Sequence, residues 1–218
     1  GWRHLLAAAL CDSRTRTLAL LDAYIAALGE ALTVPYSLQL NPPLWEAGHV
    51  GWFQDFWIAR NRQRSLGIRC DPDHQRPDGR LSGADALYNS SRVAHATRWN
   101  LPLPDLAATR EYLAAGLADT LSLLASAPET DDALYFFRLV LFHEDMHTEA
   151  AIYMAQALAI PLPAGLLGPA RTCSGGGALS VPAQTWMLGY AGDGFAFDNE
   201  LSAHPVELGA FEIDADVV

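Results

Sequence analysis

Two histidines four residues apart, His143 and His147, have the spacing in this sequence that most directly indicates chemistry. They fall in a stretch with helical periodicity, and at 100° per residue they lie about 40° apart on one face. Phe136 and Met154 share that face, which the pattern predicts to be buried. A buried neutral imidazole needs partners for both ring nitrogens, and leaving them unpaired costs a few kcal/mol. A divalent cation shared by the two rings meets that need; separate polar partners in the core are the alternative.

A third histidine, His49, lies in another predicted helix and is a candidate ligand for the same cation. Its face of that helix is otherwise aromatic, carrying Trp45, Trp52, Phe53 and Phe56. Gly48 and Gly51 beside it would let a second helix approach closely. We therefore predict a metal site formed by His49, His143 and His147, with coordination positions left open for water or substrate. Three imidazoles suit zinc, iron or nickel, so the spacing leaves the metal open.

Residues 143–147 read HEDMH, which also matches the HExxH signature of zinc proteases with Glu144 as general base. That pattern needs a further ligand downstream. Ala150 stands where the longer metzincin motif has glycine, and Glu149 points to the opposite side of the helix. Pro161 then ends the helical pattern. A protease is therefore disfavoured.

The remaining histidines and the cysteines carry less information. We expect His4 and His74 to be solvated and His204 to be structural or at the surface, whereas His95 either approaches the site or is exposed. The three cysteines are far apart and form no CxxC pair: Cys11, Cys70 and Cys173. This usage predicts reduced thiols, buried as small hydrophobic residues, in a cytoplasmic protein.

The net charge limits the classes of partner that the protein can bind. The 218 residues include 14 basic and 25 acidic side chains, for a formal net charge of −11. An acidic surface repels phosphate backbones and anionic lipids, so we expect no nucleic acid and no membrane partner. No apolar run approaches the roughly 20 residues of a membrane span. Small-molecule substrates are the expected partners.

The candidate ligands must be positioned by helices. Helical periodicity covers about residues 2–30, 43–60, 105–126 and 130–158, with Asp105 at the start of the third stretch and Thr130 as cap of the fourth. About forty residues between the second and third helices, 61–104, form a connection long enough to fold over a site or to be mobile. The predicted fold class is mainly α: a four-helix bundle with one long crossover.

The composition changes after residue 160. Residues 161–178 are rich in proline and glycine and are predicted to be a linker. Residues 179–188 and 206–213 have strand patterns, and two strands do not make a stable unit by themselves. We therefore predict a bundle domain over residues 1–160 and, over 179–218, the opening of a second domain that is cut short.

Two segments together resemble a known family. The sequences PPLWEAGH (42–49) and FHEDMHTE (142–149) resemble the DinB-like bundle of the ergothioneine sulfoxide synthases. Residues 181–214 resemble the start of their formylglycine-generating-enzyme-like α+β domain. The resemblance implies an oxidoreductase with non-haem Fe(II) held by His49, His143 and His147. Such enzymes use O2 to join a chalcogen atom to the imidazole of hercynine.

The resemblance also indicates a branch. Sulfur-using members carry Gln-Gln between the two helix histidines, where this sequence has Asp145 and Met146. Residues 84–95, ADALYNSSRVAH, resemble the selenoneine synthases, which use a selenosugar donor in place of a thiol. Loss of the amides removes hydrogen-bonding capacity where donor chemistry is set. The resemblance therefore favours selenoneine over ergothioneine biosynthesis.

Five residues are predicted to contact the substrates: Arg92, Arg98, Trp52, Phe53 and Met146. The arginines would grip polar groups, and the aromatic rings would face the trimethylammonium group of hercynine. No catalytic acid or base is assigned, because the tyrosine that serves in sulfur-using members has no counterpart by motif. The alternative functions are a DinB-like metal-dependent hydrolase or thiol transferase, and a non-catalytic bundle with packed histidines.

Overall fold

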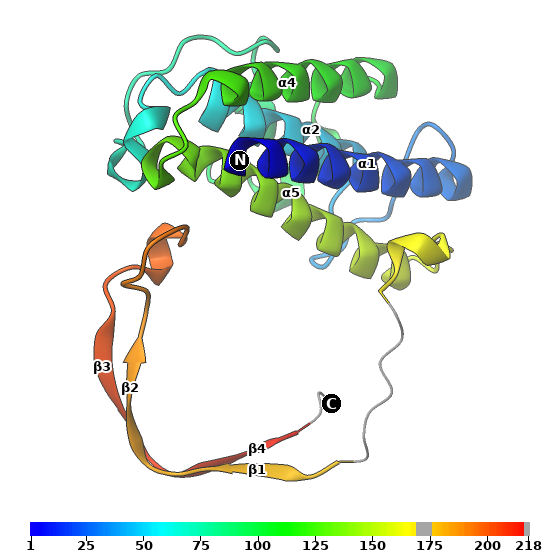
Figure 1. Ribbon diagram of the computed structural model, residues 1–218. Helices are drawn as coiled ribbons and strands as arrows, with labels where there is room; N and C mark the ends of the chain where they lie inside the picture. Colours follow the sequence, from blue (N-terminus) through cyan, green and yellow to red (C-terminus); the bar gives the residue numbers. More distant parts are fainter. Residues whose placement is uncertain (169–175, 216–218) are drawn as a thin grey trace. The chain divides into compact units, whose positions relative to one another are not determined.

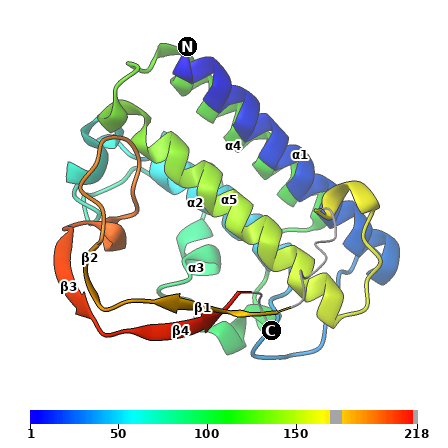
Figure 2. The same ribbon diagram turned by 60° about the horizontal axis from the view of Figure 1, so that its bottom comes forward.

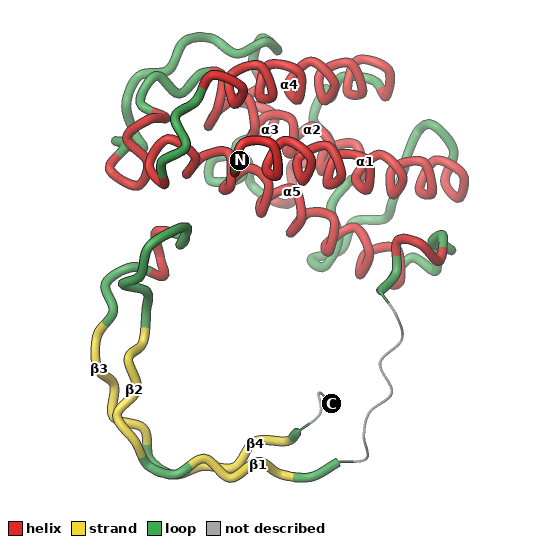
Figure 3. The backbone as a smooth tube through the Cα atoms, viewed as in Figure 1, coloured by secondary structure: helices red, strands yellow, loops and turns green. Residues whose placement is uncertain are grey.

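The computed structural model describes residues 1–168 and 176–215 of the chain. These residues form two compact units, Gly1–Leu166 and Leu167–Val218. The first unit is helical and the second contains short strands (Figures 1 and 3). The prediction of a mainly α fold with strands near the C-terminus is confirmed.

Four long helices build the first unit: α1 (Trp2–Leu28), α2 (Pro43–Gln54), α4 (Leu106–Ser126) and α5 (Asp131–Ala157). They match the four predicted helices to within a few residues. α1 packs on α5 and on α4, and α2 packs on α4 and α5 (Figures 1 and 2). Every long helix therefore contributes to one core.

The helix ends follow local rules for the most part. The side chains of Asp105 and Thr130 cap α4 and α5, each accepting a hydrogen bond from the backbone three residues on. α1 ends at Leu28, two residues earlier than predicted, because Gly29 turns the chain with φ of 78°. α2 continues into a π-helical turn, η1 (Asp55–Ala59), which accounts for the predicted helix up to residue 60.

Among the described residues, the buried core of the helical unit includes two apolar clusters. One joins α1, α2, α4 and α5 and contains Leu21, Tyr24, Leu32, Ala47, Val50, Leu113, Ala155 and Ile160. The other lies at the aromatic face of α2 and contains Trp45, Trp52, Ala84, Tyr88 and Tyr112. The predicted aromatic face of α2 is therefore buried. His49, which lies on this face, is next to the second cluster.

The crossover between α2 and α4 is anchored on the bundle through three short helices: η2 (Arg64–Arg69), α3 (Ala84–Tyr88) and η3 (His95–Asn100). The Trp45 indole donates to the carbonyl of Leu87 over 2.8 Å. The Tyr88 ring lies against Gly48, where a Cβ would be 2.3 Å from ring atoms. The glycine thus allows the crossover to approach α2 closely, whereas Gly51 does the same for Tyr112 of α4.

The second unit consists of antiparallel strand pairs. β1 (Ala178–Val181) pairs with β4 (Phe211–Asp214), and β2 (Gln184–Leu188) pairs with β3 (His204–Leu208). Each predicted long strand is thus two short ones. The side chains are almost all exposed, so these strands have no packed core of their own among the described residues.

The segment that joins the units differs from a plain linker. The predicted linker 161–178 contains a 3-10 turn, η4 (Ala164–Leu166), and its last residue begins β1. Residues 169–175 lie outside the described residues. Another 3-10 turn, η5 (Asp198–Glu200), lies between β2 and β3.

Two predictions about single residues are wrong. Cys11 is exposed although Cys70 is buried as expected, and Cys173 lies outside the described residues. Cys11 lies one step of 100° around α1 from the buried Leu10, which takes it out of the core stripe. His74 is half-buried, not solvated: its Nδ1 lies 2.6 Å from the Asp71 carbonyl oxygen. Over the described ranges, no helix is long and apolar enough to cross a membrane.

Candidate metal centre

The three predicted ligands converge between α2 and α5. One ring nitrogen from each of His49, His143 and His147 lies within 4.8 Å of the other two, and His49 and His143 are buried. The Nε2 atoms of His49 and His143 are 3.2 Å apart. Histidines at i and i+4 of α5 meet one from α2 because the buried faces of the two helices pack together.

The spacing fits a shared divalent cation. Two imidazole nitrogens bound at about 2.0–2.1 Å, with an angle of about 90–110° between them, lie about 2.8–3.4 Å apart. The His49–His143 separation of 3.2 Å falls in this range. The His49–His143 pair can therefore bind one cation, and His147, within 4.8 Å of both, is the candidate third ligand.

His49 is oriented by the crossover. Its Nδ1 lies 2.8 Å from the carbonyl oxygen of Tyr88, and because a carbonyl only accepts, Nδ1 carries the proton. The lone pair of the neutral ring is then on Nε2, which faces His143. Burial, together with the neighbouring His147, lowers the pKa of His49 to about 4. The ring is accordingly neutral at physiological pH and available as a ligand.

His147 is oriented by a carboxylate. Its Nδ1 donates to Glu46 Oε2 at 2.5 Å, so the Nε2 lone pair is again presented. Glu46 lies on α2, and its side chain is buried. Burial raises the pKa of this carboxyl, but the polar neighbours, with the hydrogen bond from His147 first, outweigh that effect and the net pKa is lowered. An ionised carboxylate behind a ligand histidine is the arrangement that fixes ring orientation in metal sites.

His143 is held by stacking. The Phe53 ring lies parallel to it with centroids 3.5 Å apart. Burial and the neighbouring His147 and His49 keep the pKa of His143 well below its usual value, so this ring too is neutral. Trp45 and Trp52 stack on the His49 ring at 4.9 and 5.6 Å. The predicted aromatic substrate wall thus includes rings that pack on the ligands themselves.

The five predicted substrate residues lie in different surroundings. Trp52 and Phe53 contact the ligand rings, and the Trp52 indole also donates to Asp85. Met146 lies on the outer side of α5 with 48% of its surface exposed. Arg92 is exposed on the crossover. Arg98 is half-buried, with its guanidinium 3.8 Å above the Trp45 ring.

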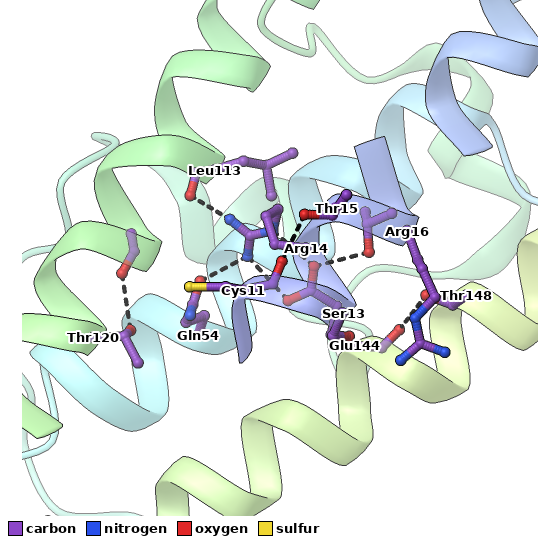
Figure 4. A network of polar contacts seen from close by, with 12 residues as sticks. Cys11, Ser13, Arg14, Thr15, Arg16, Gln54, Leu113, Thr120, Glu144 and Thr148 are labelled. Carbon is purple, nitrogen blue, oxygen red and sulfur yellow. Dashed lines mark hydrogen bonds and ion pairs between the residues drawn. The ribbon is translucent and has the colours of Figure 1, made fainter. Parts of the chain in front are cut away.

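The glutamate of the HExxH pattern is engaged elsewhere. Glu144 is buried and forms an ion pair with Arg14 of α1, with Nε 2.7 Å from Oε1. Arg14 also donates to Gln54 Oε1 and to the Leu113 carbonyl (Figure 4). Thr17 donates to the same Glu144 oxygen at 2.8 Å. Both oxygens of this carboxylate accept from Arg14 of α1, which argues against Glu144 as the general base of a zinc protease.

Two further polar residues of α5 and one histidine lie away from the site. Asp145 accepts from Ser13 and pairs with Arg16 of α1. Glu149 is exposed, as predicted. His95 is half-buried and donates from Nε2 to the carbonyl of Leu40; it is not one of the three histidines that converge.

The residues that orient the ligands were not among the predicted site residues. Glu46 and the Tyr88 carbonyl hold two of the three rings, and Arg14 holds Glu144. Glu46 had a signal, since it lies three residues before His49 and such positions are neighbours on a helix. Tyr88 acts through its backbone, and no side-chain pattern reports that.

The comparisons with known proteins agree with this fold. The family model of the DinB superfamily matches residues 9–151, and the chain belongs to this superfamily. The chain is 32% identical over 224 residues to hercynine oxygenase of Mycolicibacterium smegmatis, covering 97% of this chain and 47% of that protein. It is 32% identical to hercynine oxygenase of Mycolicibacterium thermoresistibile, covering 95% and 44%, and 31% identical to that of Mycobacterium tuberculosis, covering 95% and 47%. The chain thus spans about half the length of these curated relatives.

Proposed function

We propose that this chain is the metal-binding part of a non-haem Fe(II) oxidoreductase that acts on hercynine with O2. The observation that carries the proposal is the convergence of His49, His143 and His147, whose ring nitrogens lie within 4.8 Å of one another. The relatives named hercynine oxygenase support the substrate. The finer proposal is that the bond formed joins carbon to selenium from a selenosugar, with a thiol as the alternative donor.

The residues of the chain have defined parts in this proposal. When bound, Fe(II) supplies a redox-active centre with coordination positions open to substrates. The Tyr88 carbonyl and Glu46 hold the Nδ1 protons of His49 and His147, so both rings present Nε2. Phe53 covers one face of His143 and limits its contact with water. The site is thereby organised before any metal arrives, which favours tight binding.

The selenium preference rests on the residues between the two α5 histidines. Asp145 is bound to Ser13 and Arg16, so it does not replace an amide at the site. Met146 is exposed and has no strong hydrogen-bonding group. Neither residue offers the amide that sulfur-using members carry. The proposed contacts for the two organic substrates are Arg92, Arg98, Trp52, Phe53 and Met146.

Metal content tests the first part of the proposal. Protein purified without oxygen should contain about one equivalent of iron, and His147→Ala should lose it. His4→Ala, in an exposed histidine of α1, is the matched control and should retain the metal. Wild-type protein that takes up no iron, or a His147→Ala variant that still holds it, would remove the proposal. Zinc together with ester or peptide cleavage would favour the hydrolase.

Donor choice is tested by product analysis. The form to assay is one with the full length of the relatives, because the matched residues are under half of those proteins. Hercynine is supplied with O2 and either a selenosugar or a cysteine-containing thiol, and the product is identified by mass. Carbon–selenium product is expected. Product from the thiol alone would overturn the selenium preference and leave the iron site standing.

A further inference from the structure

The helical unit contains a small cavity that borders one of the ligand histidines. It has a volume of about 50 Å3 and is lined by side chains of α1, α2 and α5. His147 and Glu46, whose Oε2 accepts from the His147 ring, both belong to the lining. Leu21 and Val50 of the first core cluster line it as well. The cavity therefore shares residues with the bundle core and with the metal centre.

The lining is mainly apolar. It includes Leu20, Leu21, Val50, Ala151 and Met154, and every residue of the lining is buried or half-buried. A cavity inside a protein that is lined by apolar side chains stays free of water and takes up apolar molecules instead. The residue types thus favour an uncharged, apolar occupant.

The hydroxyl groups in the lining already have partners in the protein. Thr17 and Thr148 both donate to Glu144, to its Oε1 at 2.8 Å and to its backbone carbonyl at 3.0 Å. Tyr24 donates to the Ala151 carbonyl at 2.7 Å. A buried water molecule needs about two to four polar partners. Because the three hydroxyl protons are engaged, none of them is available to a water in the cavity, which again favours an apolar occupant.

The volume limits the size of the occupant. An apolar cavity of about 150 Å3 binds benzene, and this cavity has about a third of that volume. Hercynine, a sugar and a cysteine-containing thiol are therefore too large for it, whereas a diatomic gas fits. Among the substrates of the proposed reaction, dioxygen is the one that is both apolar and small enough.

We propose that this cavity is a binding site for dioxygen beside the metal centre. The inference rests on the proposed function, in which O2 is a substrate. Dioxygen carries no charge and no hydrogen-bonding proton, so its transfer from water into apolar surroundings is favourable. Because His147 belongs both to the cavity and to the histidine trio, dioxygen held there is next to a ligand of the proposed iron.

The paramagnetism of dioxygen tests the site without any metal. Dissolved O2 speeds the relaxation of protons close to it, so methyl relaxation rates of the metal-free 218-residue chain are compared under nitrogen and under increasing O2 pressure. The methyl groups of Leu20, Val50 and Met154 should show the larger increase. Those of Ile58 and Leu124, which are equally buried and outside the cavity, are the internal reference.

Two changes in the lining should act in opposite directions. Ala151→Leu places a larger apolar side chain in the cavity and should abolish the excess relaxation at Val50 and Met154. Leu20→Ala enlarges the cavity and should increase that excess, so the test stays decisive if one variant folds poorly by circular dichroism. Ala115→Leu is the matched control, since Ala115 is a half-buried alanine of α4 outside the lining, and it should behave as the wild type does.

The link to the metal centre has a separate readout. Co2+, whose visible absorption reports binding, is first titrated without oxygen to check that Ala151→Leu and Ala115→Leu keep the metal affinity of the wild type. The proteins are then loaded with Fe(II) and mixed with O2, and the remaining Fe(II) is measured with a ferrous chelator. Ala151→Leu should lose Fe(II) more slowly than the wild type, and Ala115→Leu at the wild-type rate.

The outcomes separate the cavity from the function. Equal relaxation increases at the cavity methyls and at the reference methyls overturn the dioxygen site and leave the iron site standing. An excess that persists in folded Ala151→Leu places the gas elsewhere and also overturns it. An Fe(II) oxidation rate that Ala151→Leu leaves unchanged overturns the link to the metal centre. A chain that binds no iron removes the proposed function, and the relaxation data on metal-free protein still decide whether dioxygen binds in the cavity.

Discussion

Two buried carboxylates near the metal centre, Glu46 of α2 and Glu144 of α5, have the same chemistry and different partners. Their residues are 8% and 2% exposed, and each lies within three residues of a ligand histidine. Glu46 accepts from the ligand His147. Glu144 follows His143 directly and is paired with Arg14 of α1.

The difference shows that the partner, not the residue type, decides what a buried charge does. The Glu46 carboxylate orients the imidazole of His147, so its removal should lower metal affinity. The Glu144 carboxylate joins α5 to α1 through Arg14, which also donates to Gln54 and to the Leu113 carbonyl (Figure 4). Its removal should therefore lower the stability of the fold. Changes near Glu46 and changes near Glu144 should therefore have separable effects, on metal affinity and on stability.

The largest effect is expected at the Glu144 region. Glu144→Ala leaves the Arg14 charge buried without its carboxylate, which costs about 3–5 kcal/mol of unfolding free energy. Urea unfolding of the metal-free protein, followed by the helical circular dichroism signal, measures this. Glu149→Ala, at an exposed site of the same helix, should change it by less than about 0.5 kcal/mol. Comparable stability of the two variants would contradict the role given to the pair.

The same region offers a compensating test. Arg14→Met together with Glu144→Leu removes both charges and fills the space with apolar groups. Such replacements are often neutral, so the double variant should recover most of the stability that Glu144→Ala loses. Its Co2+ affinity should stay near that of the wild type, because no ligand or ligand partner is altered. A large loss of metal affinity would show that the two regions are not separable.

The next largest effect on stability is expected from metal binding itself. A cation at 100 times its dissociation constant stabilises the folded state by about 2.7 kcal/mol. Urea midpoints with and without Co2+ should show that gain in the wild type and none in His147→Ala. An equal shift in both proteins would mean that the cation binds elsewhere.

At the Glu46 region the effect should appear in affinity. Glu46→Gln keeps an acceptor for His147 but removes the charge, and about a tenfold loss of Co2+ affinity is expected; Glu46→Leu removes the acceptor and should approach 100-fold. The unfolding free energy should fall by only about 1 kcal/mol for Glu46→Gln, the scale of one hydrogen bond. A metal titration beside a urea curve checks both, and a variant that loses stability but no affinity would reverse the comparison.

The contribution of a single hydrogen bond can be tested on the Glu144 side. Thr17→Val removes the hydroxyl that donates to Glu144 over 2.8 Å and should cost about 1.5 kcal/mol, because the acceptor is charged. Thr15→Val is the matched control on α1, since its hydroxyl bonds only the exposed Cys11 carbonyl one turn earlier. The two urea midpoints should differ, and their Co2+ affinities should not.

Much of the bundle follows from local patterns. Thr130 and Asp105 cap helices where their side chains predict caps, and the apolar periodicity of the four stretches gives the faces that are buried. The trio His49, His143 and His147 could be predicted because three imidazoles on buried faces interrupt an apolar pattern. Such signals are local, and a helix of fixed period carries them to one face.

The strands and the surroundings of single residues were harder to predict from the sequence. The two long strands predicted from residues 179–188 and 206–213 are each divided, because Pro182 and Gly209 interrupt the patterns at the breaks between β1 and β2 and between β3 and β4. His74, expected in solvent, is half-buried in a loop whose path is set by contacts distant in sequence. Loop burial has no periodic signature.

The sequence by itself determined the four helices, their buried faces and which three imidazoles can meet. Only the tertiary structure decided that Glu46 turns toward His147 while Glu144 turns toward Arg14, and that the crossover supplies a carbonyl to His49 and a guanidinium to Asn41. Helical periodicity is a property of consecutive residues, so it is written in the sequence. The choice of partner for a buried polar group is made by whichever segment packs against it, and that becomes fixed only when the chain folds.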